Sequence, residues 1–371
     1  MAGERAGSLR MKAAILIPVL TSKDAVGADA MAMAQILDDL GIETRIFCQS
    51  SSGVSRKTWP TEGMAAFAGG PNDLVIYHFS TAWPVAVDLL QRCRGYRVVK
   101  YHNITPAGFF KPFSNEYHNG CENGRQEIAK IANLGCELYL GDSAYNFNEL
   151  EAAGSAELKG GVLAPFHRVE EIVQAEADTG MINALTDGAR NFLMVGRIAP
   201  NKGHLQLVET FSAYVRAYPD PARLILVGKI DPRLHAYTDA IRQRIDELGL
   251  VDHVLWINGA SEAQLKAAYL ASHVFMLMSE HEGFCVPLIE SMALGTPIVA
   301  HASSAIPETL GDAGIAWDEP DPWLYAASAA RLFSDDELRG DLLDCGRRRY
   351  KELFCNGVLR KRFIDFLEPV L

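Results

Sequence analysis

Patterns typical of buried strands alternate with patterns typical of helices along this chain. The first half has six short apolar runs, at 12–20, 44–48, 73–79, 97–101, 137–141 and 161–164. Helical patterns separate them, at 29–40, 85–93, 126–133 and 143–153. Because such alternation builds a parallel sheet with helices on both faces, the sequence predicts an α/β fold that begins with a doubly wound domain.

A second series of the same kind follows a polar interval at 168–189. Its apolar runs lie at 191–195, 223–227, 254–257, 274–278 and 297–300. The length of 371 residues also suits two domains. We therefore predict four parts: a disordered extension (1–10), an N-terminal domain (11–168), a C-terminal domain (169–350) and a last helix (351–371). The linker is expected near 165–175.

The bulk composition excludes several classes of protein. The chain is 49% hydrophobic and carries a formal net charge of -11, which argues against nucleic-acid binding because that function needs a basic surface. Seven cysteines are scattered without a C-x-x-C pair, so we expect no zinc site, no disulfide framework and a reducing cytosol. No apolar run reaches the roughly 20 residues that cross a bilayer, and the polar start lacks the apolar core of a signal peptide.

The most informative segment is 279–300, which reads as a strand end, a turn, a helix and a second strand. Pro287 suits a first helical position, and Gly295 suits a helix stop. The backbone amides just before this helix should point off its N-terminus, where they form a seat for an anion. They belong to Gly283, Phe284, Cys285 and Val286.

Two carboxylates flank this anion seat. Glu282 lies in the loop before the helix, and Glu290 lies about one turn inside it. A surface acid in a loop and a solvated helix acid would be the ordinary interpretation of either residue alone. Together with an anion seat, they suit a ligand that carries both phosphate and hydroxyl groups.

A second loop with two cations follows the apolar run 191–195. It begins at Gly196 and contains Arg197 and Lys202. A strand, a glycine-bearing cationic loop and a helix place positive charge at the carboxyl end of a sheet, where α/β proteins bind phosphates. Cations in loops are usually solvated. A binding role for Arg197 and Lys202 is favoured by the presence of the segment 279–300 with its two carboxylates.

The segment 279–300 resembles the E-x7-E region of the retaining glycosyltransferases of family 4. These enzymes have the GT-B structure, in which two Rossmann-like domains face a cleft and the last helix returns to the N-terminal domain. The resemblance implies that Glu282 binds the hydroxyls of a donor sugar and that Glu290 binds the nucleotide ribose. It also implies that Arg197 and Lys202 bind the donor diphosphate. The likeness is strong over 190–318 and looser in the first half.

One residue departs from the family pattern. The family commonly has glycine at the position of Cys285, and a thiol adds bulk beside the proposed phosphate seat. Glycine is also scarce in the first loop, 21–29, where the family has a glycine-rich loop near the donor. Only Gly27 is present here. It either contacts the ligand or is required only by the backbone conformation of the turn.

Three further residues are candidates because they follow strands. His102 lies at the end of 97–101, where the resemblance implies a histidine near the reacting carbon of the donor sugar; the alternative is a half-buried histidine. Lys229 and Asn258 follow two strands of the second series and are expected near the nucleotide. A solvated lysine is the alternative for Lys229.

These observations predict a retaining glycosyltransferase that moves a hexose from a nucleoside diphosphate sugar to an acceptor hydroxyl. The segment Tyr101–Pro106 resembles part of bacterial polysaccharide and lipopolysaccharide mannosyltransferases, so GDP-mannose ranks ahead of UDP-hexoses. We expect His102, Arg197, Lys202 and Glu282 to act in catalysis, without a cofactor or a metal. A phosphorylase, a sugar-nucleotide epimerase and a non-catalytic sugar-nucleotide-binding protein remain as alternatives.

The expected partners are the donor and a sugar or lipid-linked glycan acceptor. Two basic clusters are candidate contacts for anionic lipid, although charge runs usually form solvated faces. They comprise Arg92, Arg94, Arg97 and Lys100, and then Arg347–Arg349, Lys351 and Arg360–Arg362. We therefore expect a cytoplasmic protein, or one held peripherally at the inner face of the cell membrane.

Overall fold

The N-terminal half forms one parallel sheet. The computed structural model describes residues 11–21 and 24–371, so the predicted extension 1–10 lies outside it. Seven strands have the order β5-β3-β1-β6-β7-β8-β9. They are β1 (Lys12–Leu16), β3 (Glu43–Phe47), β5 (Thr58–Trp59), β6 (Leu74–Phe79), β7 (Tyr96–Tyr101), β8 (Leu138–Gly141) and β9 (Gly160–Val162).

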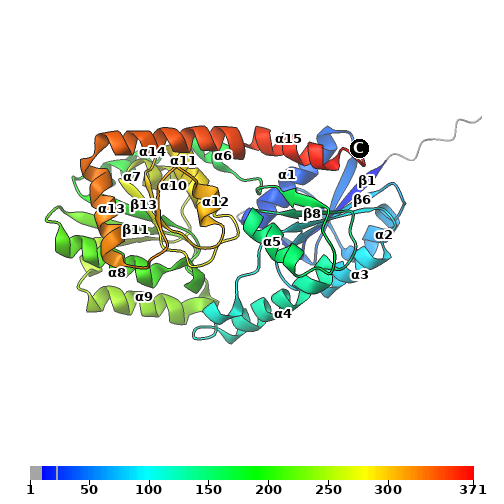
Figure 1. Ribbon diagram of the computed structural model, residues 1–371, viewed down its shortest axis with the longest axis horizontal. Helices are drawn as coiled ribbons and strands as arrows, with labels where there is room; N and C mark the ends of the chain where they lie inside the picture. Colours follow the sequence, from blue (N-terminus) through cyan, green and yellow to red (C-terminus); the bar gives the residue numbers. More distant parts are fainter. Residues whose placement is uncertain (1–10, 22–23) are drawn as a thin grey trace, which may run out of the picture.

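Helices cover both faces of this sheet (Figure 1). They are α1 (Ala25–Asp39), α2 (Met64–Phe67), α3 (Pro84–Arg92), α4 (Asn115–Ala132) and α5 (Ala144–Ala152). A separate pair of short parallel strands joins β2 (Val19–Thr21) to β4 (Ser50–Ser52). The core of the domain is made by strand residues such as Ile15 and Ile76, which are both fully buried.

The C-terminal half repeats the plan with six parallel strands in the order β12-β11-β10-β13-β14-β15. They are β10 (Arg190–Val195), β11 (Ala222–Val227), β12 (Val254–Ile257), β13 (Val274–Leu277), β14 (Ile298–His301) and β15 (Ile315–Trp317). The helices are α6 (Val169–Gln174), α7 (Thr179–Leu185), α8 (His204–Ala217), α9 (His235–Glu247), α10 (Glu262–Leu270), α11 (Val286–Leu294), α12 (Ile306–Leu310), α13 (Pro322–Ser334) and α14 (Asp336–Arg349).

The strand order places the candidate loops side by side. The chain runs outward from β10 through β11 to β12 and then returns to the other side of β10 with β13. Ligands of doubly wound sheets bind at such a reversal, beyond the carboxyl ends of the strands. The loops that follow β10 and β13 carry Lys202 and Glu282, so the topology itself brings these two residues to one point.

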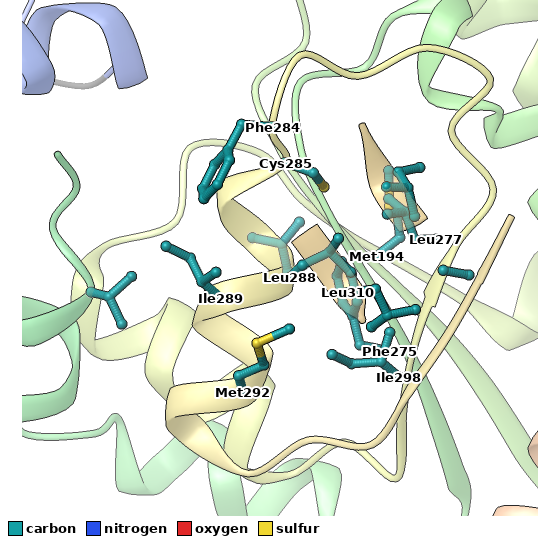
Figure 2. Close-up of a cluster of buried hydrophobic side chains, with 14 of the residues drawn as sticks. Met194, Phe275, Leu277, Phe284, Cys285, Leu288, Ile289, Met292, Ile298 and Leu310 are labelled. Carbon is teal, nitrogen blue, oxygen red and sulfur yellow. The ribbon is translucent and has the colours of Figure 1, made fainter. Parts of the chain in front are cut away.

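The helix α11 packs its apolar face onto this sheet. Leu288, Ile289 and Met292 lie in one cluster with Phe275 of β13 and Ile298 of β14 (Figure 2). Their exposed fractions do not exceed 2%. Because burying a large apolar side chain contributes about 1.5–3 kcal/mol, this contact fixes the start of α11 against the ends of both strands.

The last helix, α15 (Asn356–Leu367), crosses to the N-terminal domain, as predicted (Figure 1). Phe363 meets Phe166 with ring centroids 6.2 Å apart, and Arg360 pairs with Asp39 of α1. A short π-helix at 350–354 separates it from α14. The prediction of two doubly wound parallel-sheet domains is confirmed, whereas the exact domain limits stay predictions.

Two local predictions were wrong. The run 12–20 forms β1 and β2 instead of one strand, because Pro18 between them has no N–H to give to a ladder. The helix predicted at 126–133 begins at Asn115, since Ser114 caps it by accepting from Tyr117 N. The expected linker at 165–175 contains α6, whose Val169 and Ile172 are buried, and its place as a domain limit stays a prediction.

Candidate functional site

The start of α11 has the geometry of an anion seat. Cys285 is its N-cap, with φ 76° and ψ 75° in the left-handed region, where an ordinary side chain costs about 1–2 kcal/mol. This backbone explains why glycine suits the position. Within residues 11–21 and 24–371, no atom accepts a hydrogen bond from the amides of Gly283, Phe284, Cys285 or Val286. Four donors are thus available at a helix N-terminus.

Lys202 and Glu282 form a nearly buried ion pair beside this seat. Nζ of Lys202 lies 2.7 Å from each carboxylate oxygen of Glu282. The side chains are 19% and 7% exposed. The backbone amide of Glu282 also donates to Ser304 Oγ at 2.7 Å. Sequence analysis placed both residues at the donor, and the structure brings them into direct contact.

Lys202 is held by a tight turn after β10. Residues Pro200–Lys202 form one 3-10 turn, and Gly203 then adopts φ 65° before α8 begins. A Cβ on Gly203 would lie 1.8 Å from the carbonyl oxygen of Met278. Only glycine therefore lets the end of β13 approach this turn, which is what sets the distance between Lys202 and Glu282.

Glu290 lies in the second turn of α11 and is almost fully buried. It accepts a hydrogen bond from the hydroxyl of Tyr269, with 2.6 Å between the oxygens. Burial raises the pKa of Glu290, and the Tyr269 hydroxyl partly offsets this effect. The structure places Glu290 on the same helix as the anion seat, and its predicted contact with a ribose stays a prediction.

Arg197 points across the domain boundary. Its guanidinium donates to the hydroxyl of Tyr117, 3.0 Å away, and lies 5.3 Å from the centre of that ring. The same hydroxyl donates to Asp231 Oδ2, while Arg233 donates to it at 2.9 Å and pairs with Glu116 at 3.0 Å. In this conformation the cation predicted for the diphosphate is engaged by the N-terminus of α4.

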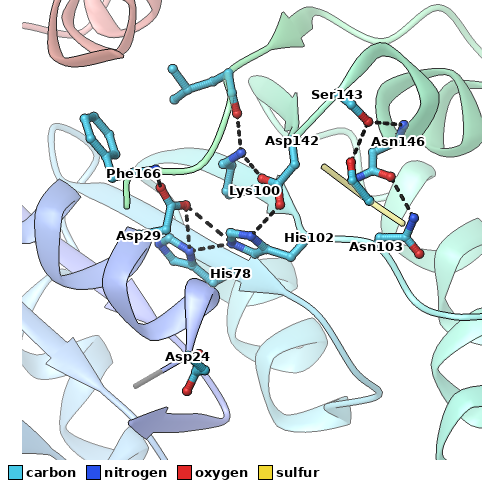
Figure 3. A network of polar contacts seen from close by, with 12 residues as sticks. Asp24, Asp29, His78, Lys100, His102, Asn103, Asp142, Ser143, Asn146 and Phe166 are labelled. Carbon is cyan, nitrogen blue, oxygen red and sulfur yellow. Dashed lines mark hydrogen bonds and ion pairs between the residues drawn. The ribbon is translucent and has the colours of Figure 1, made fainter. Parts of the chain in front are cut away.

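His102 belongs to a buried polar network inside the N-terminal domain (Figure 3). Its Nδ1 is 3.0 Å from Asp142 Oδ2, and its Nε2 is 2.8 Å from Nδ1 of His78. Asp142 also accepts from Lys100, whose side chain is fully buried. The His102 side chain is only 2% exposed. Both ring nitrogens are therefore engaged, and the predicted contact of His102 with a donor stays a prediction.

Asp29 completes this network. Its Oδ2 lies 3.6 Å from His78 Nδ1 and 3.5 Å from His102 Nε2, so three atoms of the kind that bind metals lie within 4.8 Å of one another. Burial raises the pKa of Asp29 to about 6 and lowers that of His78. Burial would also raise the pKa of Asp142, but His102 and Lys100 outweigh it and lower the pKa.

A count of charges favours a shared proton over a metal in this cluster. When all three are ionised, Asp29, Asp142 and Lys100 together carry one net negative charge in the interior. One proton balances that charge, whereas a divalent ion would leave an excess positive charge with no solvent nearby. The spacing of 2.8 Å between the two ring nitrogens is also an ordinary hydrogen bond. We therefore interpret the network as a proton-sharing one.

The remaining predicted residues have structural explanations that sequence alone could not decide. A Cβ on Gly27 would lie 2.1 Å from the carbonyl oxygen of Thr21, so glycine is required there for packing. In the same way, a Cβ on Gly228 would lie 1.8 Å from the carbonyl oxygen of Gly196, so the backbone at 196 packs directly against a glycine. Asn258 Oδ1 accepts from Ile230 N, and Lys229 is exposed. Donor contacts of these residues stay predictions.

The comparisons with known proteins bear on the C-terminal half. Residues 182–349 match the family described as glycosyl transferases group 1. The match contains the β10 loop, the ion pair and α11. This match covers less than half of the chain, and it shows that the C-terminal domain is similar to this family.

Named relatives extend this similarity. The chain is 28% identical over 316 residues to D-inositol 3-phosphate glycosyltransferase of Corynebacterium glutamicum, covering 77% of this chain and 72% of the relative. It is 29% identical to mannosylfructose-phosphate synthase of Agrobacterium fabrum (47% of this chain, 40% of the relative). It is 34% identical to MMP alpha-(1->4)-mannosyltransferase of Mycolicibacterium hassiacum (49% and 44%). The chain thus spans less than half of the last two.

Solved structures agree with the chain over its whole length. Sucrose-phosphate synthase of Thermosynechococcus elongatus has a TM-score of 0.77 at 18% identity, covering 97% of this chain and 99% of the other. HepE of Anabaena, in complex with UDP and glucose, has a TM-score of 0.75 at 16% identity, covering 97% and 100%. WaaG, a glycosyltransferase of lipopolysaccharide biosynthesis, has 0.71 at 14%, covering 95% and 98%. These likenesses confirm the GT-B fold.

Sequence analysis missed several residues that surround the candidate site. Tyr117 meets Arg197, Tyr269 meets Glu290, and Asn103, Ser143 and Asn146 meet the loop of Glu282. The pair Asp142–Ser143 is typical of a helix cap, and Ser143 is one, since its Oγ accepts from Asn146 N. A single sequence carries no signal that a cap also reaches the other domain.

Several members of the two basic clusters are engaged by other groups of the protein, and the predicted contact of these clusters with anionic lipid stays a prediction. Lys100 is buried with Asp142, and Arg97 pairs with Glu137 at 2.8 Å. Of the second cluster, Arg349 donates to the carbonyl oxygens of Glu308 and Thr309, and other members are paired as well: Arg347 with Asp344, Arg348 with Asp312, Arg360 with Asp39 and Lys361 with Asp365. In the described part of the chain, no helix is long and apolar enough to cross a membrane.

Replacing His204 with phenylalanine should flatten the pH dependence of stability. His204 is 1% exposed at the start of α8, and burial lowers its pKa to about 3. A depressed histidine pKa contributes stability above about pH 6.5 that is lost as pH falls. Between pH 7 and pH 5 the wild type should therefore lose about 2 kcal/mol more than His204→Phe.

Urea titrations at the two pH values measure this difference. The matched control is His235→Phe, because the His235 ring is exposed, whereas the His204 ring is buried. It should lose as much stability as the wild type does. Equal losses for His204→Phe and the wild type would contradict a neutral, buried His204.

Proposed function

We propose that this protein is a retaining glycosyltransferase that moves a hexose, with mannose ranked first, from a nucleoside diphosphate sugar to an acceptor hydroxyl. The observation that carries the proposal is the Lys202–Glu282 pair beside the available amides at the start of α11. A fixed cation, four N–H donors and a carboxylate meet there at the reversal of strand order. That combination suits a diphosphate joined to a hydroxylated sugar.

Each part of the donor would contact the groups that match its charge and hydrogen-bonding capacity. Lys202 and the α11 amides would bind the diphosphate, Glu282 the sugar hydroxyls, and Glu290 the ribose. Arg197 would join them by exchanging the Tyr117 hydroxyl for a phosphate oxygen, which is the stronger, charge-assisted partner. Donor binding is thereby linked to the contact between α4 and the C-terminal domain.

The reaction would break the bond between the anomeric carbon and the diphosphate oxygen and form the new glycosidic bond on the same face. The acceptor proton would pass to an oxygen of the departing diphosphate. Lys202, Arg197 and the α11 amides would stabilise the charge that develops there, and preorganised donors of this kind usually contribute more to catalysis than any other effect. We propose that no metal is needed because these groups already supply the positive charge.

The names of relatives and neighbours support a nucleotide-linked hexose. Two relatives are named for mannose, and HepE of Anabaena was solved with UDP and glucose and with UDP-glucose. We therefore keep GDP-mannose and UDP-hexoses as the donors to test. The acceptor would be a sugar or lipid-linked glycan bound from the N-terminal domain, and the protein would act in the cytoplasm or at the inner membrane face.

A thermal-shift panel with GDP, UDP, ADP and TDP tests the proposal. A ligand at 100 times its Kd stabilises the folded state by about 2.7 kcal/mol, which moves the melting temperature measurably. GDP or UDP should give the largest shift. Stabilisation by ADP or TDP alone would overturn the donor assignment, and no shift with any nucleotide would overturn the proposed function.

The two rival functions differ in what the protein consumes. A phosphorylase would need free phosphate as a co-substrate, and a non-catalytic subunit would bind a donor without consuming it. Release of nucleoside diphosphate from the intact sugar nucleotide, in phosphate-free buffer with an acceptor glycan, is expected here. The GT-B fold alone fits all three functions, so this measurement separates them.

A further inference from the structure

The loop that carries Glu282 is held by the opposite domain. His281 Nε2 donates to Oδ1 of Asn103, 2.9 Å away, and Ser143 Oγ donates to the carbonyl oxygen of Gly283 at 2.7 Å. Asn103 follows β7, and Ser143 caps α5, so both come from the N-terminal domain (Figure 3). The two hydrogen bonds flank Glu282, with one residue on each side of it.

Gly283 lies in closest contact with this part of the N-terminal domain. A Cβ on Gly283 would be 2.6 Å from Cβ of Asn103 and 3.1 Å from Nδ2 of Asn146. Asn146 is fully buried, and within the described residues its Nδ2 has no hydrogen-bond partner, although its Oδ1 accepts from Asn103 Nδ2 at 2.9 Å. The fit leaves no space for a side chain at position 283.

The backbone of Asn103 is shaped for this contact. Its φ of 73° lies in the left-handed region, which asparagine visits more readily than most residues. The side chain then uses both ends: the amide nitrogen donates within its own domain, to Asn146, and the oxygen accepts across the boundary, from His281. Burial lowers the pKa of His281 to about 4, so its ring is neutral at pH 7.

We propose that Asn103 is a positioning residue that holds the Glu282 loop in the shape that pairs Glu282 with Lys202. The donor loop of the C-terminal domain is thereby completed by the N-terminal domain. The structural part of this proposal is independent of the activity, and only its kinetic consequence rests on the proposed function. Glu282 would lose its fixed direction whenever the Asn103 contact opens.

Hydrogen exchange of the protein without ligand tests the structural part. In Asn103→Gly, the two hydrogen-bonded amides of the segment 281–284 should exchange at least tenfold faster than in the wild type: His281 N, which donates to Asn201 O, and Glu282 N, which donates to Ser304 Oγ. Glycine tolerates φ 73° without strain, so this variant removes the side chain alone. The matched control is Asn133→Gly, which removes another N-terminal-domain asparagine that bonds Ala129 O and Ser155 N. It should leave exchange at 281–284 unchanged.

A second variant approaches the same contact from the other domain. His281→Phe keeps a ring beside Tyr145, whose ring centre is 5.7 Å away, but removes the donor to Asn103. It should also speed exchange at 281–284, and the double variant should add little, because both substitutions remove the same hydrogen bond across the domain boundary. Additive effects, or wild-type exchange at 281–284 in both single variants, would overturn the proposal.

Kinetics provide the readout that a purely structural role would not move. Asn103→Gly should lower kcat at least tenfold while the Kd for GDP or UDP stays within twofold of the wild type, since Lys202, Arg197 and the amides of Cys285 and Val286 lie outside the loosened segment. An equal loss in both would overturn the positioning role. If no donor is consumed by the wild type while exchange at 281–284 still rises in Asn103→Gly, the proposed function fails and the positioning of the loop stands.

Discussion

Replacing Lys202 with alanine should slow sugar transfer at least hundredfold, more than any other single change at the loop after β10. The substitution removes a cation from the diphosphate and leaves the Glu282 carboxylate, only 7% exposed, without its partner. Removing one preorganised donor to a developing negative charge typically costs about 10²–10³ in rate, and the unpaired carboxylate would also repel the diphosphate. Arg197→Ala should cost less, about tenfold, because its guanidinium is exposed.

Turnover of donor under saturating acceptor measures both effects. Lys130→Ala is the matched control, because Lys130 is an exposed lysine of α4. It should turn over at the wild-type rate. Wild-type turnover in Lys202→Ala would remove Lys202 from the site. A variant that merely unfolds is recognised by a lowered melting temperature, so the comparison is made at a temperature where all variants are folded.

The two carboxylates, Glu282 and Glu290, are expected to separate sugar recognition from nucleotide recognition. Glu282→Gln keeps the shape of the side chain but weakens its bond to Lys202, and it should lose affinity for the intact donor while nucleoside diphosphate still binds. Glu290→Gln should weaken both ligands, because the ribose is common to them. Calorimetry with each ligand distinguishes the roles, and equal losses of both ligands in both variants would contradict the division.

Local sequence patterns were sufficient to predict the fold and the two loops that meet at the site. Apolar runs predict a strand where the run is long, as in 223–227. The short strand β15 was not predicted, because it lies at the edge of the sheet and its side chains are largely exposed. The loops after β10 and β13 could be placed because residues at the carboxyl ends of neighbouring strands must lie close together. Their contact needed no knowledge of the other domain.

What could not be predicted depends on contacts between distant parts of the chain. Asn103 and His281 are 178 positions apart and meet only through the contact between the two domains. The left-handed backbone conformation of Cys285 could not be predicted from the residue itself, because cysteine has no preference for that conformation. Lys100 falls in a predicted surface cluster because lysines are usually solvated, yet it points into the interior, where Asp142 and the carbonyl oxygen of Leu163 accept from it.

The largest effect on stability is expected from the replacement of Lys100. Replacing it with methionine keeps much of its volume but leaves Asp142 buried with one fewer cation and the Leu163 carbonyl without its donor. Because an uncompensated charge inside a protein is so unfavourable, we expect Lys100→Met to lower the free energy of unfolding by about 3–5 kcal/mol at pH 7. Urea titration of both variant and wild type measures the loss.

A second substitution shows whether the charge is the cause. Lys100→Met/Asp142→Asn removes the carboxylate that Lys100 leaves behind, so the double variant should regain at least half of the lost stability, although the bond from His102 becomes weaker. The coupling between the two sites should therefore be large, as it is for residues in direct contact. If the two losses simply add, Lys100 stabilises the domain by packing alone, and the charge balance inferred for the network of Asp29, His78 and His102 is wrong.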